Sequence, residues 1–111
     1  MSYIYVISSG LYRPNVYKIG YHTGSESKLR KRYYTSLGII NLHLFLETKN
    51  HRKVEKEIFV KLDQYRIKGN KRKPECFEVE LHKIKPVVYD MISKHGEFKH
   101  KNPDKSRCTI I

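Results

Sequence analysis

Two tyrosine-rich segments near the start of the chain, followed by an arginine-rich one, carry the residues that could do chemistry. The segments are Tyr3-Ile4-Tyr5, Tyr17-Lys18-Ile19-Gly20 and Leu29-Arg30-Lys31-Arg32-Tyr33. Tyrosine hydroxyls can position a water molecule or a phosphate, and the planar guanidinium of arginine fits phosphate oxygens and keeps its proton. A phenol with a pKa of about 10 needs a nearby cation to act as a base, and Lys18 directly follows Tyr17. Together these residue types suit chemistry on a phosphate group.

One carboxylate, Glu55, stands on the apolar side of a predicted helix. The apolar stripe of that helix is formed by Val54, Ile58, Phe59, Leu62 and Tyr65. On a helical wheel Glu55 lies about 45° from the centre of this stripe, whereas Glu57 lies well outside it. A carboxylate in such a place is costly unless a cation or a donor meets it. Glu55 is then either an edge residue that reaches water or pairs with a lysine, or a ligand for a metal ion.

The tyrosines and arginines also have purely structural interpretations. Tyr3 and Tyr5 point to one face of their strand and could be ordinary half-buried sheet residues. Arg30 and Arg32 could belong to a solvated basic face of a helix. The helical wheel places Arg30 nearer the apolar stripe than Arg32, and it does not choose between them.

The elements that position these residues follow from hydrophobic periodicity and turn residues. Strands are predicted at residues 3–8, 16–21 and 39–47, a short fourth strand at 75–79, and helices at 27–37, from an Asn50 cap to about 66, and at 82–95. The short loop between the first two strands predicts antiparallel pairing. Gly20 inside the second strand is typical of a place where another group approaches closely. The order β-β-α-β-α-(β)-α predicts a small domain that mixes helices and strands (α/β in the broad sense, α+β in the strict one). Its sheet should be mainly antiparallel and flanked by helices.

The chain is strongly basic, and this charge indicates which classes of partner it would bind. Its 23 Lys and Arg against 11 Asp and Glu give a formal charge of +12. Such an excess attracts polyanions, nucleic acid first and an anionic membrane second. The segment Arg66 to Lys73 is predicted to be an exposed loop whose basic residues would follow a phosphate backbone, namely Lys68, Lys71, Arg72 and Lys73.

The length of 111 residues predicts one domain, over 1–95, followed by a basic tail over 96–111. Two cysteines form no secreted disulfide framework, no signal peptide is evident, and no apolar run could span a bilayer. We therefore expect the protein to be located in a reducing intracellular compartment, the cytoplasm or the nucleus. Cys108 begins a C-a-a-X pattern, so a C-terminal lipid anchor stands as an alternative to an unmodified tail.

Taken in order and spacing, these motifs resemble the GIY-YIG nuclease superfamily over about residues 3–80. The closest similarity is to the branch common in phages and large DNA viruses, whose second motif contains Lys-Ile-Gly, as Lys18-Ile19-Gly20 does here. The resemblance implies a three-stranded antiparallel sheet with helices packed on it. It also implies a nuclease that hydrolyses phosphodiester bonds with one divalent metal ion.

Residue by residue, the resemblance implies that Tyr5 is the tyrosine of the first motif and Gly20 the glycine of the second. Arg32 matches the helix arginine that stabilises the phosphate, and Glu55 matches the glutamate that holds the metal. Glu75, before Cys76-Phe77, resembles a terminal acidic-aromatic signature of the same branch, and we expect it to be structural or secondary.

The function expected from these arguments is metal-dependent cleavage of DNA, more than RNA. Glu55 would hold Mg²⁺ or Mn²⁺, and Arg32 would offset charge on the phosphate. Tyr5 or Tyr17 would orient or deprotonate the attacking water, with help from Lys18. Residues Arg30 and Lys31 would add contacts to the nucleic acid backbone.

Two functional alternatives remain open at this point. One is a non-catalytic nucleic-acid-binding module on the same fold, and the other is a basic protein tethered to a membrane through Cys108. One metal site makes one cut, so cleavage of both DNA strands would need two events or a homodimer.

Overall fold

The computed structural model describes residues 2–67 and 75–95. It contains a four-stranded antiparallel sheet, with strands in the order β3-β1-β2-β4. The strands are β1 (Ser2–Ser9), β2 (Val16–Thr23), β3 (Ile40–Thr48) and β4 (Cys76–Glu78). The α+β class is confirmed, as is the antiparallel pairing of the first two strands. The three strands implied by the family resemblance are corrected to four. The short strand predicted at 75–79 is confirmed as β4, which hydrogen-bonds along the outer edge of β2.

Three helices accompany the sheet: α1 (Glu26–Leu37), α2 (His51–Lys61) and α3 (Leu81–His95). The Ser25 hydroxyl caps α1 by accepting from the backbone N–H of Lys28, and α1 ends at Gly38, whose φ of 71° suits glycine. The second helix is shorter than predicted. After Lys61 the chain tightens into a 3₁₀ turn at Asp63–Tyr65.

The predicted side-chain cap of α2 is wrong. Asn50 does occupy the position before the helix, but its side chain makes no capping hydrogen bond. Its Nδ2 instead donates to the backbone carbonyl of His95, 2.6 Å away, and so joins the start of α2 to the end of α3. A cap would use the Asn50 Oδ1 as an acceptor, but the side chain is held toward α3 through its Nδ2 donor and makes no bond to the start of α2.

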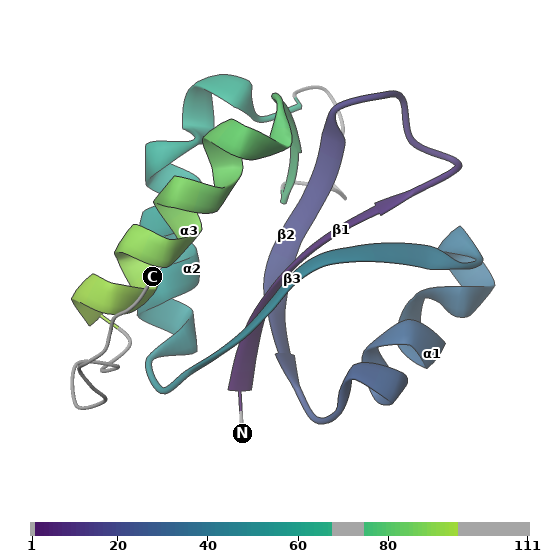
Figure 1. Cartoon of the computed structure of the whole chain (residues 1–111), viewed down its shortest axis with the longest axis horizontal. Helices are drawn as coiled ribbons and strands as arrows, with labels where there is room; N and C mark the ends of the chain where they lie inside the picture. The colour runs from purple at the N-terminus through teal and green to yellow at the C-terminus, as the bar shows by residue number, and fades with distance from the viewer. Residues whose placement is uncertain (1, 68–74, 96–111) are drawn as a thin grey trace.

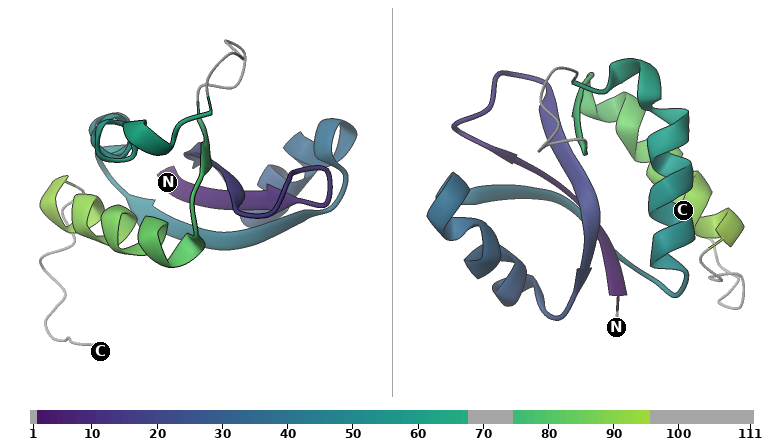
Figure 2. Two further views of the ribbon diagram at one scale, coloured as in Figure 1. Left: turned by 90° about the horizontal axis from the view of Figure 1, so that it is seen from above. Right: turned by 180° about the vertical axis from the view of Figure 1, so that it is seen from behind.

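The sheet separates two hydrophobic cores. Helices α2 and α3 lie together against one face, and α1 lies against the other (Figures 1 and 2). The larger core includes Ile4, Val6, Ile19, Val54, Ile58 and Ile84, and the smaller one under α1 includes Tyr5, Ile7, Leu29, Leu37 and Ile40. Alternation along β1 therefore sends Ile4 to the α2 side and Tyr5 to the α1 side.

The short fourth strand leaves part of β2 uncovered among the described residues. Strand β4 pairs with Val16 to Lys18, and the backbone N–H of Ile19 donates to the Glu75 carbonyl at 3.0 Å. The second half of β2, from Gly20 to Thr23, continues past the end of β4. The candidate site lies at this place, between α1 and α2.

Three sequence expectations concern segments outside this description. The basic residues Lys68, Lys71, Arg72 and Lys73, the tail over 96–111 and its Cys108 all lie outside the described residues. Within residues 2–67 and 75–95, no helix is long and apolar enough to cross a membrane.

Candidate functional site

A cavity of about 360 Å³ is lined by polar side chains from two strands, two helices and the residue before β4. Tyr5 comes from β1, Arg32 from α1, Glu55 from α2, and Glu75 from the residue before β4. The second half of β2 forms the remaining wall; the lining consists of Tyr5, Gly20, Tyr21, His22, Thr23, Arg32, Glu55 and Glu75. The three residues that the sequence singled out as tyrosine, arginine and carboxylate thus line one cavity.

Gly20 allows the ring of Tyr5 to lie flat against β2. The two residues face each other in the β1–β2 register. A Cβ atom at position 20 would stand 2.7 Å from the Tyr5 hydroxyl oxygen and 2.9 Å from Cζ, closer than real side chains come. The predicted close approach at Gly20 is therefore present, and the approaching group is the Tyr5 side chain.

Tyr5 presents a neutral phenol to the cavity. It is 1% exposed, and its hydroxyl lies 2.6 Å from the hydroxyl of Tyr33 on α1. Burial, followed by the hydrogen bond to Tyr33, raises the pKa of Tyr5 well above its ordinary value. Such a phenol stays protonated at neutral pH, so it can orient a water molecule or a phosphate but is poorly suited to removing a proton.

Two carboxylates face the cavity. Burial, and next the negative charge of Glu75, raise the pKa of Glu55, while Arg52 and Lys18 act in the opposite direction. Glu75 Oε1 is buried without a hydrogen bond, and Lys18 Nζ lies 3.4 Å from it in an ion pair whose lysine side chain is 12% exposed. A cation placed between these carboxylates would relieve their repulsion.

The donor set is small, which limits the metal that it would suit. Among the residues described, no group of three or more His, Cys, Asp or Glu side chains is placed to hold a metal ion. This excludes a closed zinc-type site there, which needs four ligands. Mg²⁺ keeps several waters and is bound by one or two carboxylates together with substrate phosphate, and Glu55 with Glu75 fits that pattern.

Positive charge lines the other side of the cavity. Arg32 lies with its guanidinium 5.1 Å from the Tyr33 ring. Burial lowers the pKa of His22, and the charges of Arg32 and Lys28 lower it further. His22 is therefore neutral at pH 7, and its Nε2 lies 3.1 Å from the Ser25 carbonyl at the start of α1.

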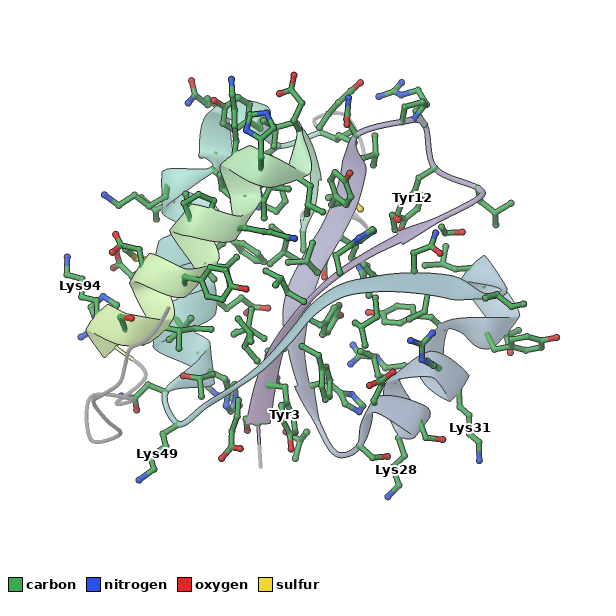
Figure 3. The ribbon with its side chains drawn as sticks, viewed as in Figure 1. Tyr3, Tyr12, Lys28, Lys31, Lys49 and Lys94 are labelled. Atoms are coloured by element: carbon green, nitrogen blue, oxygen red, sulfur yellow. The ribbon has the colours of Figure 1, made fainter. Side chains whose placement is uncertain are left out.

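The remaining predicted residues do not line the cavity. Tyr17 alternates away from Gly20, packs against the larger core, and sets its ring 5.3 Å from His43. Arg30 donates to the Glu26 carboxylate and to the Ile40 carbonyl and does not line the cavity. Lys18 contacts the site indirectly, through its ion pair with Glu75. Lys31 is exposed on α1 and points away from the protein body, as does Lys28 (Figure 3).

Sequence reasoning missed or undervalued two residues of the cavity wall, His22 and Glu75, and one residue bonded to that wall, Tyr33. Extending the second strand by one alternating position would have placed His22 beside Gly20 and Lys18. Glu75 stood in a recognised motif, but its approach to Glu55 depends on where β4 docks. Tyr33 follows the Leu29 and Leu37 spacing and so looks like a core residue, and no local signal predicts its hydrogen bond.

Comparison with known proteins gives one result. The model of the T5orf172 domain matches residues 2–92, whereas no curated protein and no solved structure matches the chain. This domain is nuclease-related, similar to GIY-YIG and HNH domains, and is compatible with a nuclease-like or DNA-binding module. The match spans the whole sheet and all of α1 and α2, and the chain belongs to the T5orf172 domain family.

Proposed function

We propose that the protein is a metal-dependent endonuclease of the GIY-YIG type that hydrolyses phosphodiester bonds of DNA. One observation carries the proposal: Tyr5, Arg32 and Glu55, from three different elements, line a single cavity together with a second carboxylate. Tyr5 also belongs to the smaller core, but Arg32 and Glu55 come from helices on opposite faces of the sheet and reach the same cavity as Tyr5. Perturbed ionisable groups in a cavity are typical of active sites.

Glu55 would hold a divalent metal ion, with Glu75 as the second carboxylate within reach. Mg²⁺ or Mn²⁺ is the class of ion that suits oxygen ligands and phosphate. When bound, it would supply positive charge to the phosphate and to the leaving oxygen. The raised pKa of Glu55 means that its carboxylate is available to a cation only above a higher pH than for an ordinary glutamate.

Arg32 and Tyr5 would act directly on the phosphate and the attacking water. The Arg32 guanidinium would donate to the phosphate oxygens as negative charge grows on them. Tyr5, neutral and held rigidly between β2 and Tyr33, would orient the water or a phosphate oxygen through its hydroxyl. Tyr17 has no role in this proposal, because it lies on the far side of β2.

Basic residues on both sides of the cavity would bind the flanking backbone. Lys28 on α1 and Arg52 on α2 are exposed, and each acts electrostatically on a residue of the cavity wall. Lys56 lines a neighbouring hollow that shares Glu55 with the cavity. A nucleic acid strand running from α1 to α2 would meet these charges in turn, and its affinity would fall steeply with salt.

The decisive experiment measures nicking of supercoiled plasmid by the full chain with Mg²⁺ or Mn²⁺, and with EDTA as the control. Glu55→Gln should abolish nicking while DNA binding persists. Glu57→Gln is the matched control, since Glu57 is on the same helix and does not line the cavity. Salt-dependent DNA binding without any metal-dependent nicking would replace this proposal with the non-catalytic binding module.

A further inference from the structure

Tyr5 in the cavity wall and Tyr33 on α1 form a hydrogen-bonded pair that joins two separate sequence motifs. Tyr5 Oη and Tyr33 Oη lie 2.6 Å apart, a short hydrogen bond between residues 28 positions apart in the chain. Their rings meet edge to face, with centroids 6.0 Å apart. Tyr33 packs against the smaller core and does not line the cavity, whereas Tyr5 does.

The position of Tyr33 is itself fixed from several sides. Its ring lies under two cations, with Arg32 Cζ at 5.1 Å and Lys18 Nζ at 5.7 Å from the centroid. Such contacts between cations and aromatic faces are stabilising and restrain both partners. Tyr33 therefore connects three groups of the candidate site: the hydroxyl of Tyr5, the guanidinium of Arg32 and the ammonium of Lys18.

A hydroxyl group has one donor and two acceptor positions, and it rotates unless a partner restrains it. The bond to Tyr33 uses one of these positions, whichever oxygen is the donor. If Tyr5 donates, only its lone pairs remain for the cavity, and if Tyr33 donates, the Tyr5 proton turns toward the cavity. In either direction, loss of the Tyr33 oxygen would leave the Tyr5 hydroxyl without its fixed orientation.

We propose that Tyr33 is a positioning residue for the nuclease reaction, acting by fixing the direction in which the Tyr5 hydroxyl meets the water or phosphate. This inference rests on the proposed function. Because a small misplacement of a catalytic group lowers a rate strongly, the effect of Tyr33 should appear in the chemical step and not in DNA affinity.

The test compares Tyr33→Phe with Tyr34→Phe under single-turnover conditions at saturating protein. Tyr34 is the next residue of the same helix and is 65% exposed, so its hydroxyl is a matched control. Tyr33→Phe should lower the nicking rate about tenfold with unchanged DNA affinity, whereas Tyr34→Phe should change neither. In a Tyr5→Phe background, Tyr33→Phe should cause no further loss, because both changes remove the same hydrogen bond.

A measurement without catalysis keeps the two proposals separate. In metal-free protein carrying tyrosine labelled with ¹³C at Cζ, Tyr33→Phe should shift the Tyr5 resonance, and Tyr34→Phe should not. Nicking by wild type and Tyr33→Phe at equal rates, or additive losses in the Tyr5→Phe background, would overturn the role of Tyr33 alone. Absence of nicking in the wild type would overturn the proposed function and this role with it, even if the Tyr5 resonance responds.

Discussion

Replacing Gly20 with alanine would press a methyl group against Tyr5. The new carbon would stand 2.7 Å from the Tyr5 hydroxyl oxygen and 2.9 Å from Cζ. The ring would have to retreat by about 0.7 Å to restore ordinary van der Waals distance to its oxygen. It has little room to do so, because Tyr5 is 1% exposed and its hydroxyl is bonded to Tyr33.

Two opposing effects set the size of the stability change. Overpacking a closed core costs about 1–3 kcal/mol, and alanine in a strand regains about 0.5–1 kcal/mol over glycine. The free energy of unfolding should therefore fall by about 0–2.5 kcal/mol, which lowers the Tm by up to about 10 °C in a domain of this size. The nicking rate should fall about tenfold or more, since Tyr5 would leave its position.

Gly10→Ala is the matched control for this prediction. A Cβ atom at Gly10 would meet nothing within 4 Å, so this variant should nick as the wild type does and melt at or slightly above the wild-type Tm. Thermal unfolding by circular dichroism and plasmid nicking measure the two effects. If Gly20→Ala matches Gly10→Ala in both, the close approach of Tyr5 to β2 is not a constraint on this protein. In a Tyr5→Phe background the cost of Gly20→Ala should shrink, because the nearest atom is gone.

Three further predictions concern the charges around the cavity. Burial raises the pKa of Glu55 above 4.5, so the folded state favours the protonated carboxyl group. The resulting contribution to the free energy of unfolding is present below pH 4.5 and is lost as the pH rises through the raised pKa. Glu55→Gln should then keep or raise the Tm at pH 7 while nicking is lost, and a lowered Tm at pH 7 would contradict the assigned environment. Arg32→Lys should slow nicking about 10- to 100-fold at saturating protein, because an ammonium cannot make the two parallel bonds of a guanidinium, and an unchanged rate would remove Arg32 from the reaction. The double change Lys28→Ala with Arg52→Ala should reduce the slope of log affinity against log salt by about 2, as fluorescence anisotropy on a duplex would measure, and an unchanged slope would mean that DNA binds elsewhere.

The sequence alone predicted the class of fold and most of its elements. Alternating apolar residues over 3–8 and 16–21 predicted the first two strands, and the four-residue spacing of Leu29, Tyr33 and Leu37 predicted the first helix. Those patterns are local, because the period of the side chains follows directly from the backbone geometry of a strand or a helix. The same periodicity put Glu55 beside the apolar stripe of its helix, where the structure shows it half-buried.

What local patterns could not decide is which faces of different elements meet. The helical wheel placed Arg30 nearer the apolar stripe than Arg32 and did not choose between them. Only the packing of α1 on the sheet brings Arg32 to the cavity, while Arg30 bonds to Glu26 and Ile40. Tyr17, next to Lys18 in the chain, points to the opposite face of β2.

The pair Tyr5–Tyr33 and the approach of Glu75 to Glu55 each join residues at least 20 positions apart. Contacts of that kind depend on strand order, on the length of β4 and on the packing of the helices against the sheet. Periodicity fixes the face of each element, and only the assembled fold brings those faces together around one cavity.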